Sequence, residues 1–318
     1  MTATGVFPTI AVSLGPCDDM RAELFVRLLG PESAAGRITG TIVGPQRGRD
    51  TTLPTTSRLV PLPGGDAGAV SRAILTEPAY WTPELPNLYR VDARADGPGG
   101  KAVGQAETLV GLRRLGVRGR SLWLNGRRWV PRAVVAAERP DLAALKAASL
   151  GALVTDVRDD DLALADTMGV AVMPLLGEND LTPARIAALA RHPAALFGLV
   201  DADIPAEHVA GRVATLRRAR GTMLIGQVFD GSQPPPPSQP LDFSAVRLAA
   251  GQVPHAAWRG VSAVPLVAWR HDDAEPSTGR SACDALQRDL AAWGLAAGVE
   301  RLPWDWAGYL VGVAPRSP

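Results

Sequence analysis

The chain has 318 residues, of which 46% are hydrophobic and 20% charged, and its formal net charge is +1. This length suffices for two domains with a large core, and the near-neutral charge gives no electrostatic reason to expect nucleic acid or an anionic membrane as a partner. No apolar run reaches the ~18 residues of a membrane span, and the N-terminus lacks the basic and apolar regions of a signal peptide, so a cytoplasmic location is expected.

Cysteine and histidine spacing predicts no metal centre. Cys17 and Cys283 lie far apart in the sequence, so they form neither a disulfide framework nor a Cys-x-x-Cys motif. The histidines also lack the close spacing of metal ligands: His192, His208, His255 and His271. We therefore expect no metal and no cofactor.

The first part of the chain, up to about Leu115, has short strand-length runs separated by Gly and Pro. These runs are Val6–Leu14, Ala22–Leu29, Ile38–Val43, Ser57–Pro61, Ala69–Leu75, Leu88–Ala93 and Ala102–Gly111. Seven short strands with frequent turns are typical of an immunoglobulin-like β-sandwich. We predict this fold for residues 1–115, with Trp81 and Tyr89 in its core or at the domain junction.

After Arg120 the pattern changes to apolar runs that alternate with Ala-rich helical stretches, which indicates βα units around a buried parallel sheet. The strand candidates are Val130–Val135, Ala152–Val157, Val170–Leu176, Leu196–Val200, Met223–Val228, Phe243–Leu248, Val264–Trp269 and a last one ending near Trp304. The helix candidates are Pro140–Leu150, Asp160–Met168, Thr182–Arg191, Pro205–Arg220 and Ser277–Trp293. Eight such strands predict a compact (β/α)8 TIM barrel over residues 116–318.

Five segments in this order resemble a known family. They are YWTPELPNLY (80–89), VGLRR (110–114), LWLNGRRWVPRAV (122–134), RHPAALFGLVDAD (191–203) and LPWDW (302–306). Their order and spacing resemble glycoside hydrolase family 2, the β-galactosidase and β-glucuronidase family. The resemblance implies an immunoglobulin-like sandwich followed by a TIM barrel, O-glycosyl hydrolase activity and a carbohydrate ligand.

The catalytic positions of that family are altered here. Its members are retaining glycosidases, which need two carboxylates about 5–5.5 Å apart. The resemblance places the acid/base on Asp203 and the nucleophile on Arg270, and a guanidinium cannot attack an anomeric carbon. Asp272 follows two residues later and would supply a nucleophile after a shift of register. Asp203 and Asp272 are therefore the catalytic candidates.

Other polar positions of the family are also replaced. The Asn and His of its R-G-x-N-x-H segment read Val135 and Ala137, and the Arg of its N-A-V-R segment reads Val154. A sugar site needs convergent hydrogen-bonding groups, so these replacements predict a degenerate catalytic site.

Several residues remain candidates for ligand binding. Glu178, Asp201, Asp230 and Asp305 are expected at the C-terminal rim, where this fold places active sites. Arg270 is expected at the rim end of the seventh strand, directed toward Asp201 or Asp203. The resemblance places Trp304 and Trp306 after the last strand, where they and Trp269 would offer aromatic platforms for a sugar ring.

Three functional hypotheses stay open on the sequence alone. The first is a carbohydrate-related protein with a degenerate catalytic site, either a pseudo-glycosidase or a weak sugar binder. The second is an active retaining β-glycosidase that uses Asp203 and Asp272. The third is a scaffold or interaction protein without a sugar ligand. The oligomeric state is left open.

Overall fold

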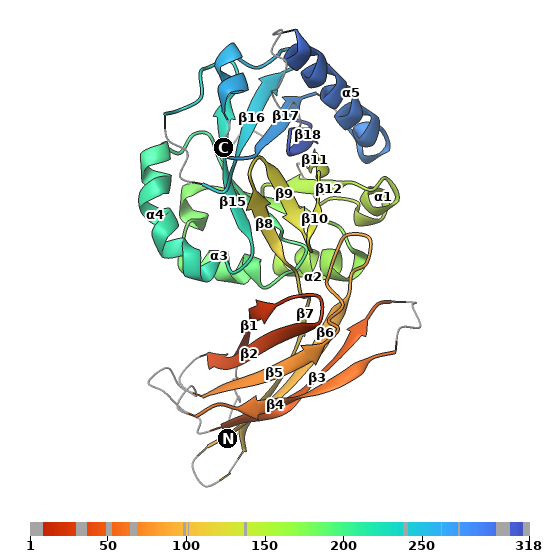
Figure 1. Cartoon of the computed structure of the whole chain (residues 1–318), viewed down its shortest axis with the longest axis vertical. Helices are drawn as coiled ribbons and strands as arrows, with labels where there is room; N and C mark the ends of the chain where they lie inside the picture. The colour runs from red at the N-terminus through yellow and green to blue at the C-terminus, as the bar shows by residue number, and fades with distance from the viewer. Residues whose placement is uncertain are drawn as a thin grey trace, which may run out of the picture. The chain divides into compact units, whose positions relative to one another are not determined.

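The computed structural model describes residues 9–29, 37–48, 53–63, 69–97, 100, 102–136, 139–237, 241–261, 263–272, 274–296 and 306–313. The chain divides into two compact units, Met1–Leu112 and Arg113–Pro318. The first is built of strands, and the second of strands and helices (Figure 1). Within the described ranges, no helix combines the length and apolar character that a membrane crossing needs.

The first unit is an antiparallel sandwich. Its strands are β1 (Thr9–Cys17), β2 (Arg21–Leu29), β3 (Arg37–Gln46), β4 (Thr55–Pro61), β5 (Val70–Thr76), β6 (Leu88–Asp96) and β7 (Ala102–Val110). They are ordered β1-β2-β5-β4-β3-β6-β7, with only a short ladder between β4 and β5. One core cluster joins apolar residues of β2 and β5 to those of β3 and β6. The predicted immunoglobulin-like sandwich is confirmed.

Strand β6 illustrates why the sandwich forms. Tyr89 and Val91 are buried in the core of the sandwich. The alternate residues Arg90 and Asp92 form an ion pair on the outer face, with 3.1 Å between the Arg90 Nε atom and a carboxylate oxygen of Asp92. This alternation is the two-residue period of a half-buried strand. Tyr89 and Trp81 are fully buried, as expected for core residues.

A small sheet opens the second unit. Strands β8 (Leu115–Arg118), β9 (Ser121–Leu124) and β10 (Arg127–Arg128) pair antiparallel in the order β10-β9-β8. Asn125 and Gly126 join the last two strands with φ values of 51° and 81°. Positive φ at both turn residues is the geometry that Asn-Gly favours in tight hairpins. The sequence reading missed these strands, although this dipeptide signals a hairpin.

Eight parallel strands then close into a barrel, which confirms the predicted TIM-barrel fold. They are β11 (Arg132–Ala136), β12 (Gly151–Val154), β13 (Val172–Leu176), β14 (Phe197–Val200), β15 (Leu224–Asp230), β16 (Phe243–Ala249), β17 (Leu266–His271) and β18 (Gly308–Val311). The prediction of the last strand was wrong in position. It begins at Gly308, so Trp306 precedes it instead of following it. A four-residue strand that starts with glycine gives little periodic signal.

Five helices flank the barrel within the described residues: α1 (Leu142–Ala147), α2 (Asp159–Met168), α3 (Pro183–Ala190), α4 (Ala206–Ala219) and α5 (Pro276–Leu295). Helix α3 starts as the sequence predicts, because the Thr182 hydroxyl accepts a hydrogen bond from the Arg185 amide at 3.3 Å and Pro183 follows the cap. Between β16 and β17 the described chain forms only the 3₁₀ helix η4 (Ala256–Gly260).

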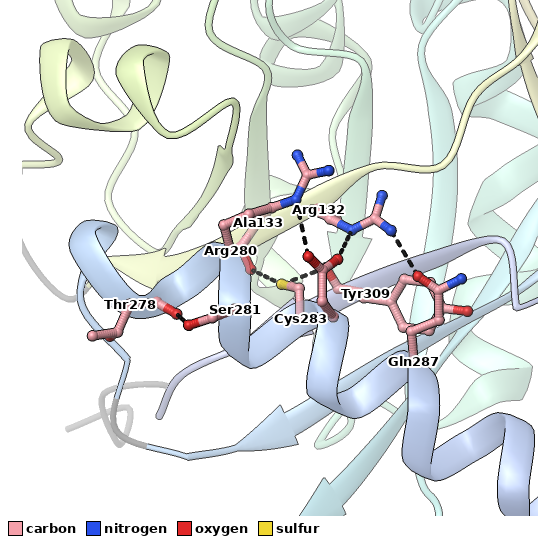
Figure 2. A network of polar contacts seen from close by, with 9 residues as sticks. Arg132, Ala133, Thr278, Arg280, Ser281, Cys283, Gln287 and Tyr309 are labelled. Carbon is pink, nitrogen blue, oxygen red and sulfur yellow. Dashed lines mark hydrogen bonds and ion pairs between the residues drawn. The ribbon is translucent and has the colours of Figure 1, made fainter.

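Helix α5 packs against β11 and β18, which pair with each other where the barrel closes. Arg132 of β11 donates to the Asp284 carboxylate at 2.8 Å and to the Gln287 side chain at 2.6 Å (Figure 2). The Cys283 thiol lies 3.5 Å from the carbonyl oxygen of Tyr309 on β18. Helix α5 therefore contacts both β11 and β18, the two strands whose pairing closes the barrel.

Candidate site at the barrel mouth

The partners of β17 show which strand faces line the barrel. The Arg270 guanidinium contacts Asp289 of α5, so Arg270 lies on the outer face, and the alternating Trp269 and His271 point inward. Residues paired in register on parallel neighbours share a face. The inward positions are therefore Ala133, Val135, Gly151, Leu153, Met173, Leu175, Phe197, Leu199, Leu224, Gly226, Val228, Asp230, Phe243, Ala245, Arg247, Ala249, Val267, Trp269, His271, Gly308 and Leu310.

Aromatic rings fill the N-terminal end of the barrel. Trp129 stacks on Phe197 with ring centroids 5.5 Å apart, and Phe197 meets Phe243 edge to face at 5.3 Å. Gly226 is needed beside them, because a Cβ atom there would lie 2.4 Å from the Phe243 ring. This end is packed core, and any ligand must approach from the C-terminal end of the strands.

The charged and ionisable inward positions gather at that C-terminal end. Asp230 of β15, Arg247 of β16 and His271 of β17 come from three consecutive strands, and Asp230 pairs in register with Arg247. Below them Trp269 is fully buried, and its indole nitrogen donates to the Gly312 carbonyl at 2.9 Å. The His271 ring lies 5.2 Å from the Trp269 ring. These side chains form a polar layer over an apolar barrel.

The surroundings of His271 favour the neutral form of its imidazole. Burial lowers the pKa of its imidazole, and the positive charge of Arg247 lowers it further. Its Nε2 atom is buried without a hydrogen-bond partner. The Asp230 carboxylate accepts hydrogen bonds from the backbone amide and hydroxyl of Ser232, at 2.9 and 2.8 Å. The C-terminal end of the barrel thus holds the cation of Arg247, the carboxylate of Asp230 and the imidazole of His271, whose Nε2 atom makes no hydrogen bond.

The expectation for Arg270 was wrong. It was predicted to point toward Asp201 or Asp203, but its guanidinium contacts Asp272 and, at 2.6 Å, Asp289 of α5. Burial by itself would lower the pKa of Arg270, but hydrogen bonds and charge from Asp289 and Asp272 raise it above its usual value. Arg270 therefore belongs to an outward ion-pair cluster.

The two catalytic candidates lie in different surroundings. Asp203 is exposed in the turn after β14, and Asp201, which starts that turn, is partly exposed. The Asp272 carboxylate accepts from Arg270 at the end of β17. Within the described part of the chain, no ion pair or side-chain hydrogen bond holds the Asp203 carboxyl group.

The remaining candidates divide between the two ends of the barrel. Glu178 pairs with Arg212 of α4 at 3.1 Å, so its carboxylate is directed to the helical layer. Trp306 is buried before β18, at the N-terminal end, and its ring lies 6.4 Å from that of Trp293 on α5. Trp304 and Asp305 lie outside the described residues.

Arg247 was missed by the sequence reading. It is a single charged residue in the apolar run Phe-Ser-Ala-Val-Arg-Leu-Ala of β16. Such a residue at the last inward position of a barrel strand points to the mouth, but that position becomes visible only once the register of the closed barrel is known.

The sequence comparison supports the sandwich half most directly. Residues 16–113 match the family described as "Glycosyl hydrolases family 2". The resemblance to glycoside hydrolase family 2 is confirmed. No curated protein matches the chain.

Three solved β-glucuronidases share the architecture. A β-glucuronidase from Bacteroides uniformis aligns over 95% of this chain and 45% of its own length, at 14% identity and a TM-score of 0.60. A β-D-glucuronidase from Dictyoglomus thermophilum aligns over 97% and 63%, at 13% identity and a TM-score of 0.61. A Ruminococcus gnavus β-glucuronidase in complex with D-glucuronic acid aligns over 95% and 60%, at 11% identity and a TM-score of 0.62.

These structural similarities support a shared fold and no more specific property. At 11–14% identity they show the fold alone, and the chain spans less than two thirds of the length of each of these enzymes. The chemistry of this chain must therefore be argued from its own side chains.

Proposed function

We propose that this chain is a glycoside hydrolase family 2-like protein that binds carbohydrate at the barrel mouth without hydrolysing O-glycosyl bonds. The observation that carries the proposal is the ion-pair cluster at the end of β17. The position expected to hold the nucleophile carries Arg270, and Arg270 contacts the neighbouring Asp272.

The cluster disfavours Asp272 as a nucleophile. A carboxylate that accepts a charge-assisted hydrogen bond from a guanidinium is stabilised as an anion, and attack on carbon would have to break that bond. Arg270 is 9% exposed, so removing Asp272 would leave a buried cation with Asp289 as its remaining partner in the cluster. Loss of one of the two partners of a buried cation is destabilising, and Asp289 limits the loss.

Asp203 lacks the positioning that an acid/base residue needs. It is exposed, and no described side chain pairs with it. Catalysis depends on holding the acid within hydrogen-bond reach of the glycosidic oxygen. An exposed carboxyl at Asp203 and an ion-paired carboxylate at Asp272 do not supply the matched pair of a retaining glycosidase.

The polar layer supports retention of a ligand. Sugar sites combine an apolar floor with a few donors and acceptors, and Asp230, Arg247 and His271 occupy inward positions near the ends of three consecutive strands, with the His271 ring beside the buried Trp269. The Ruminococcus gnavus enzyme of the same fold is solved with D-glucuronic acid. These points favour a sugar binder over a scaffold without a ligand.

The test combines hydrolysis with binding. We expect no turnover of aryl β-galactoside, β-glucuronide or β-mannoside above that of a heat-denatured sample, and binding of at least one monosaccharide at millimolar concentration in a calorimetric titration. Asp160→Asn, an exposed change on α2, serves as a matched charge control. Turnover that Asp203→Asn and Asp272→Asn each abolish, while Asp160→Asn does not, would establish the active glycosidase instead. Absence of any sugar binding by the folded protein would favour the scaffold.

A further inference from the structure

The small sheet that opens the second unit carries a high density of positive charge. Between Glu107 and Glu138 the sequence has no acidic residue, and its arginines there are Arg113, Arg114, Arg118, Arg120, Arg127, Arg128 and Arg132. Arg113 donates to the His192 carbonyl oxygen and Arg132 pairs with Asp284, so both are engaged elsewhere. The others lie in β8, in β10 or in the residues that border these strands. A protein with a net charge of only +1 thus has one strongly basic sheet.

The two faces of this sheet differ. Leu122 and Leu124 of β9 are buried, whereas Trp123 between them is directed to the outer face and is partly exposed. Gly116 of β8 pairs in register with Trp123, so it shares that face. Arg118, two residues further along β8, also lies there, with its guanidinium carbon 4.6 Å from the centroid of the Trp123 ring. The outer face therefore joins an indole ring to an exposed cation.

Gly116 leaves a pocket beside this ring. A Cβ atom at Gly116 would meet no atom within 4 Å, so the position opposite Trp123 is open. A pocket of about 210 Å³ lies here, and Arg114 and Arg118 line it together with Gly116 and Trp123. A large side chain on a neighbouring strand can cover a glycine of this kind. The outer face thus has room for one apolar side chain between two arginines.

Strand β8 is also an edge. The sheet order β10-β9-β8 leaves its far side without a paired strand among the described residues. The Asn125 amide donates to the Arg114 carbonyl oxygen at 2.8 Å, so Arg114 belongs to a hydrogen-bonded pair of the ladder with β9. Such pairs alternate along an antiparallel ladder, so Leu115 and Val117 direct their backbone N–H and C=O groups to the open edge. An edge of this kind is a template for a further strand.

Charge and spacing select the strand that fits. Two identical β8 edges would bring arginines together, so like-charge repulsion disfavours a second copy of this chain. Carboxylates fit the planar fork of a guanidinium. Arg114 and Arg118 lie four residues apart on one face, so the residues opposite them on an added strand are also four apart. The residue midway between those two faces Gly116 and the pocket.

We propose that the open edge of β8 binds an extended acidic segment of a partner protein as an added strand. The segment has an acidic, an apolar and a second acidic residue at alternate positions. Its carboxylates contact Arg114 and Arg118, its apolar side chain enters the pocket beside Trp123, and its backbone bonds to Leu115 and Val117. The inference does not depend on the proposed sugar binding, because it uses none of the residues assigned to that function.

The experiment titrates a labelled peptide, Thr-Thr-Glu-Thr-Leu-Thr-Glu-Thr-Thr, with the full chain and follows fluorescence anisotropy. A peptide with glutamine in place of both glutamates should bind about tenfold more weakly, since two exposed charge pairs contribute about threefold each. A peptide with proline on both sides of the leucine lacks the backbone donors for strand pairing, and a third peptide places the leucine and both glutamates side by side. We expect both to bind at least about tenfold more weakly.

Variants of the chain locate the binding site. Arg118→Gln should weaken the acidic peptide about threefold and leave the glutamine peptide unchanged. Arg217→Gln, at an exposed arginine of α4, changes net charge equally and should change neither. Gly116→Val fills the pocket with a side chain that meets open space, so the variant should remain folded while the acidic peptide binds at least about tenfold more weakly. Thermal unfolding checks that each variant is folded.

The other outcomes overturn the proposal. Equal binding of the acidic and glutamine peptides, or an acidic preference that survives Arg118→Gln, removes the role of charge. Proline or rearranged peptides that bind as tightly as the first show attraction without strand addition. A labelled oligothymidylate, or vesicles of phosphatidylserine, that bind more tightly than the peptide and lose binding in Arg118→Gln reveal a general polyanion surface instead. Absence of peptide binding by the folded chain excludes the site.

Discussion

Removal of the Asp166 carboxylate should destabilise the barrel unit strongly. Asp166 near the end of α2 is 8% exposed. One of its oxygens accepts from the Ala194 amide at 2.8 Å, and the other lies 2.7 Å from Nδ1 of His192. Its charge also acts on Arg113, whose pKa burial lowers to about 10 while Asp166 opposes that shift. One carboxylate therefore joins a helix end, the start of β14 and a buried guanidinium.

The size of the effect follows from what Asp166→Ala leaves behind. The buried Ala194 amide and the half-buried His192 imidazole lose a charged acceptor, at about 1.5–3 kcal/mol each. Arg113, 3% exposed, also loses the carboxylate that offsets part of its burial. A loss of about 4 kcal/mol is the central expectation. At roughly 3 °C per kcal/mol for a unit of this size, the melting temperature should fall by about 12 °C.

Denaturant titrations of the full chain, followed by circular dichroism and tryptophan fluorescence, give the measurement. Asp166→Asn keeps one oxygen acceptor and should cost less, about 2 kcal/mol. Asp160→Asn on the same helix is exposed and should change stability by under about 1 kcal/mol. An Asp166→Ala loss below about 1 kcal/mol, or equal losses for the Ala and Asn variants, would refute the reasoning.

Two further predictions concern buried positions in α5. Gly279→Ala should destabilise by about 1–3 kcal/mol, because the new Cβ would lie 2.3 Å from the Val134 side chain, whereas Gly211→Ala in α4 meets open space and should stabilise by about 0.5–1 kcal/mol. Equal thermal shifts for both variants would contradict the packing argument. Burial raises the pKa of the Cys283 thiol to about 11. The unfolded thiol ionises near pH ~8.5, so its stabilising contribution is complete below that pH and is lost as pH rises toward 11. Unfolding free energy should fall more steeply over this window for the natural chain than for Cys283→Ala, and parallel slopes would argue against the burial effect.

Much of the fold could be predicted because its strands have strong periodic patterns. The seven sandwich strands and seven of the barrel strands lie where apolar runs between turn residues placed them. The last strand did not, because Gly308–Val311 is short and the apolar Leu302–Trp306 competes with it. The Asn125-Gly126 hairpin was a readable signal that was passed over.

The site was harder to predict than the fold, because side-chain direction alternates with every residue. A shift of one position exchanges the inside of the barrel for the outside, and this is the error made for Arg270. Arg247 depends on a longer chain of reasoning, since its inward direction follows from pairing across β16, β17 and the outward contact of Arg270 with α5. No local pattern contains that information.

The aromatic rings of Trp129, Phe197 and Phe243 fill the N-terminal end of the barrel among the described residues. The aromatic layers that stabilise the barrel lie at this N-terminal end, and the residues proposed to contact a ligand lie at the C-terminal end. Substitutions at the C-terminal ends of the strands should therefore change the free energy of unfolding little, as long as the aromatic core at the N-terminal end is kept. Under the proposed function, ligand preference would change through Asp230, Arg247 and His271, apart from the aromatic core that supports the fold.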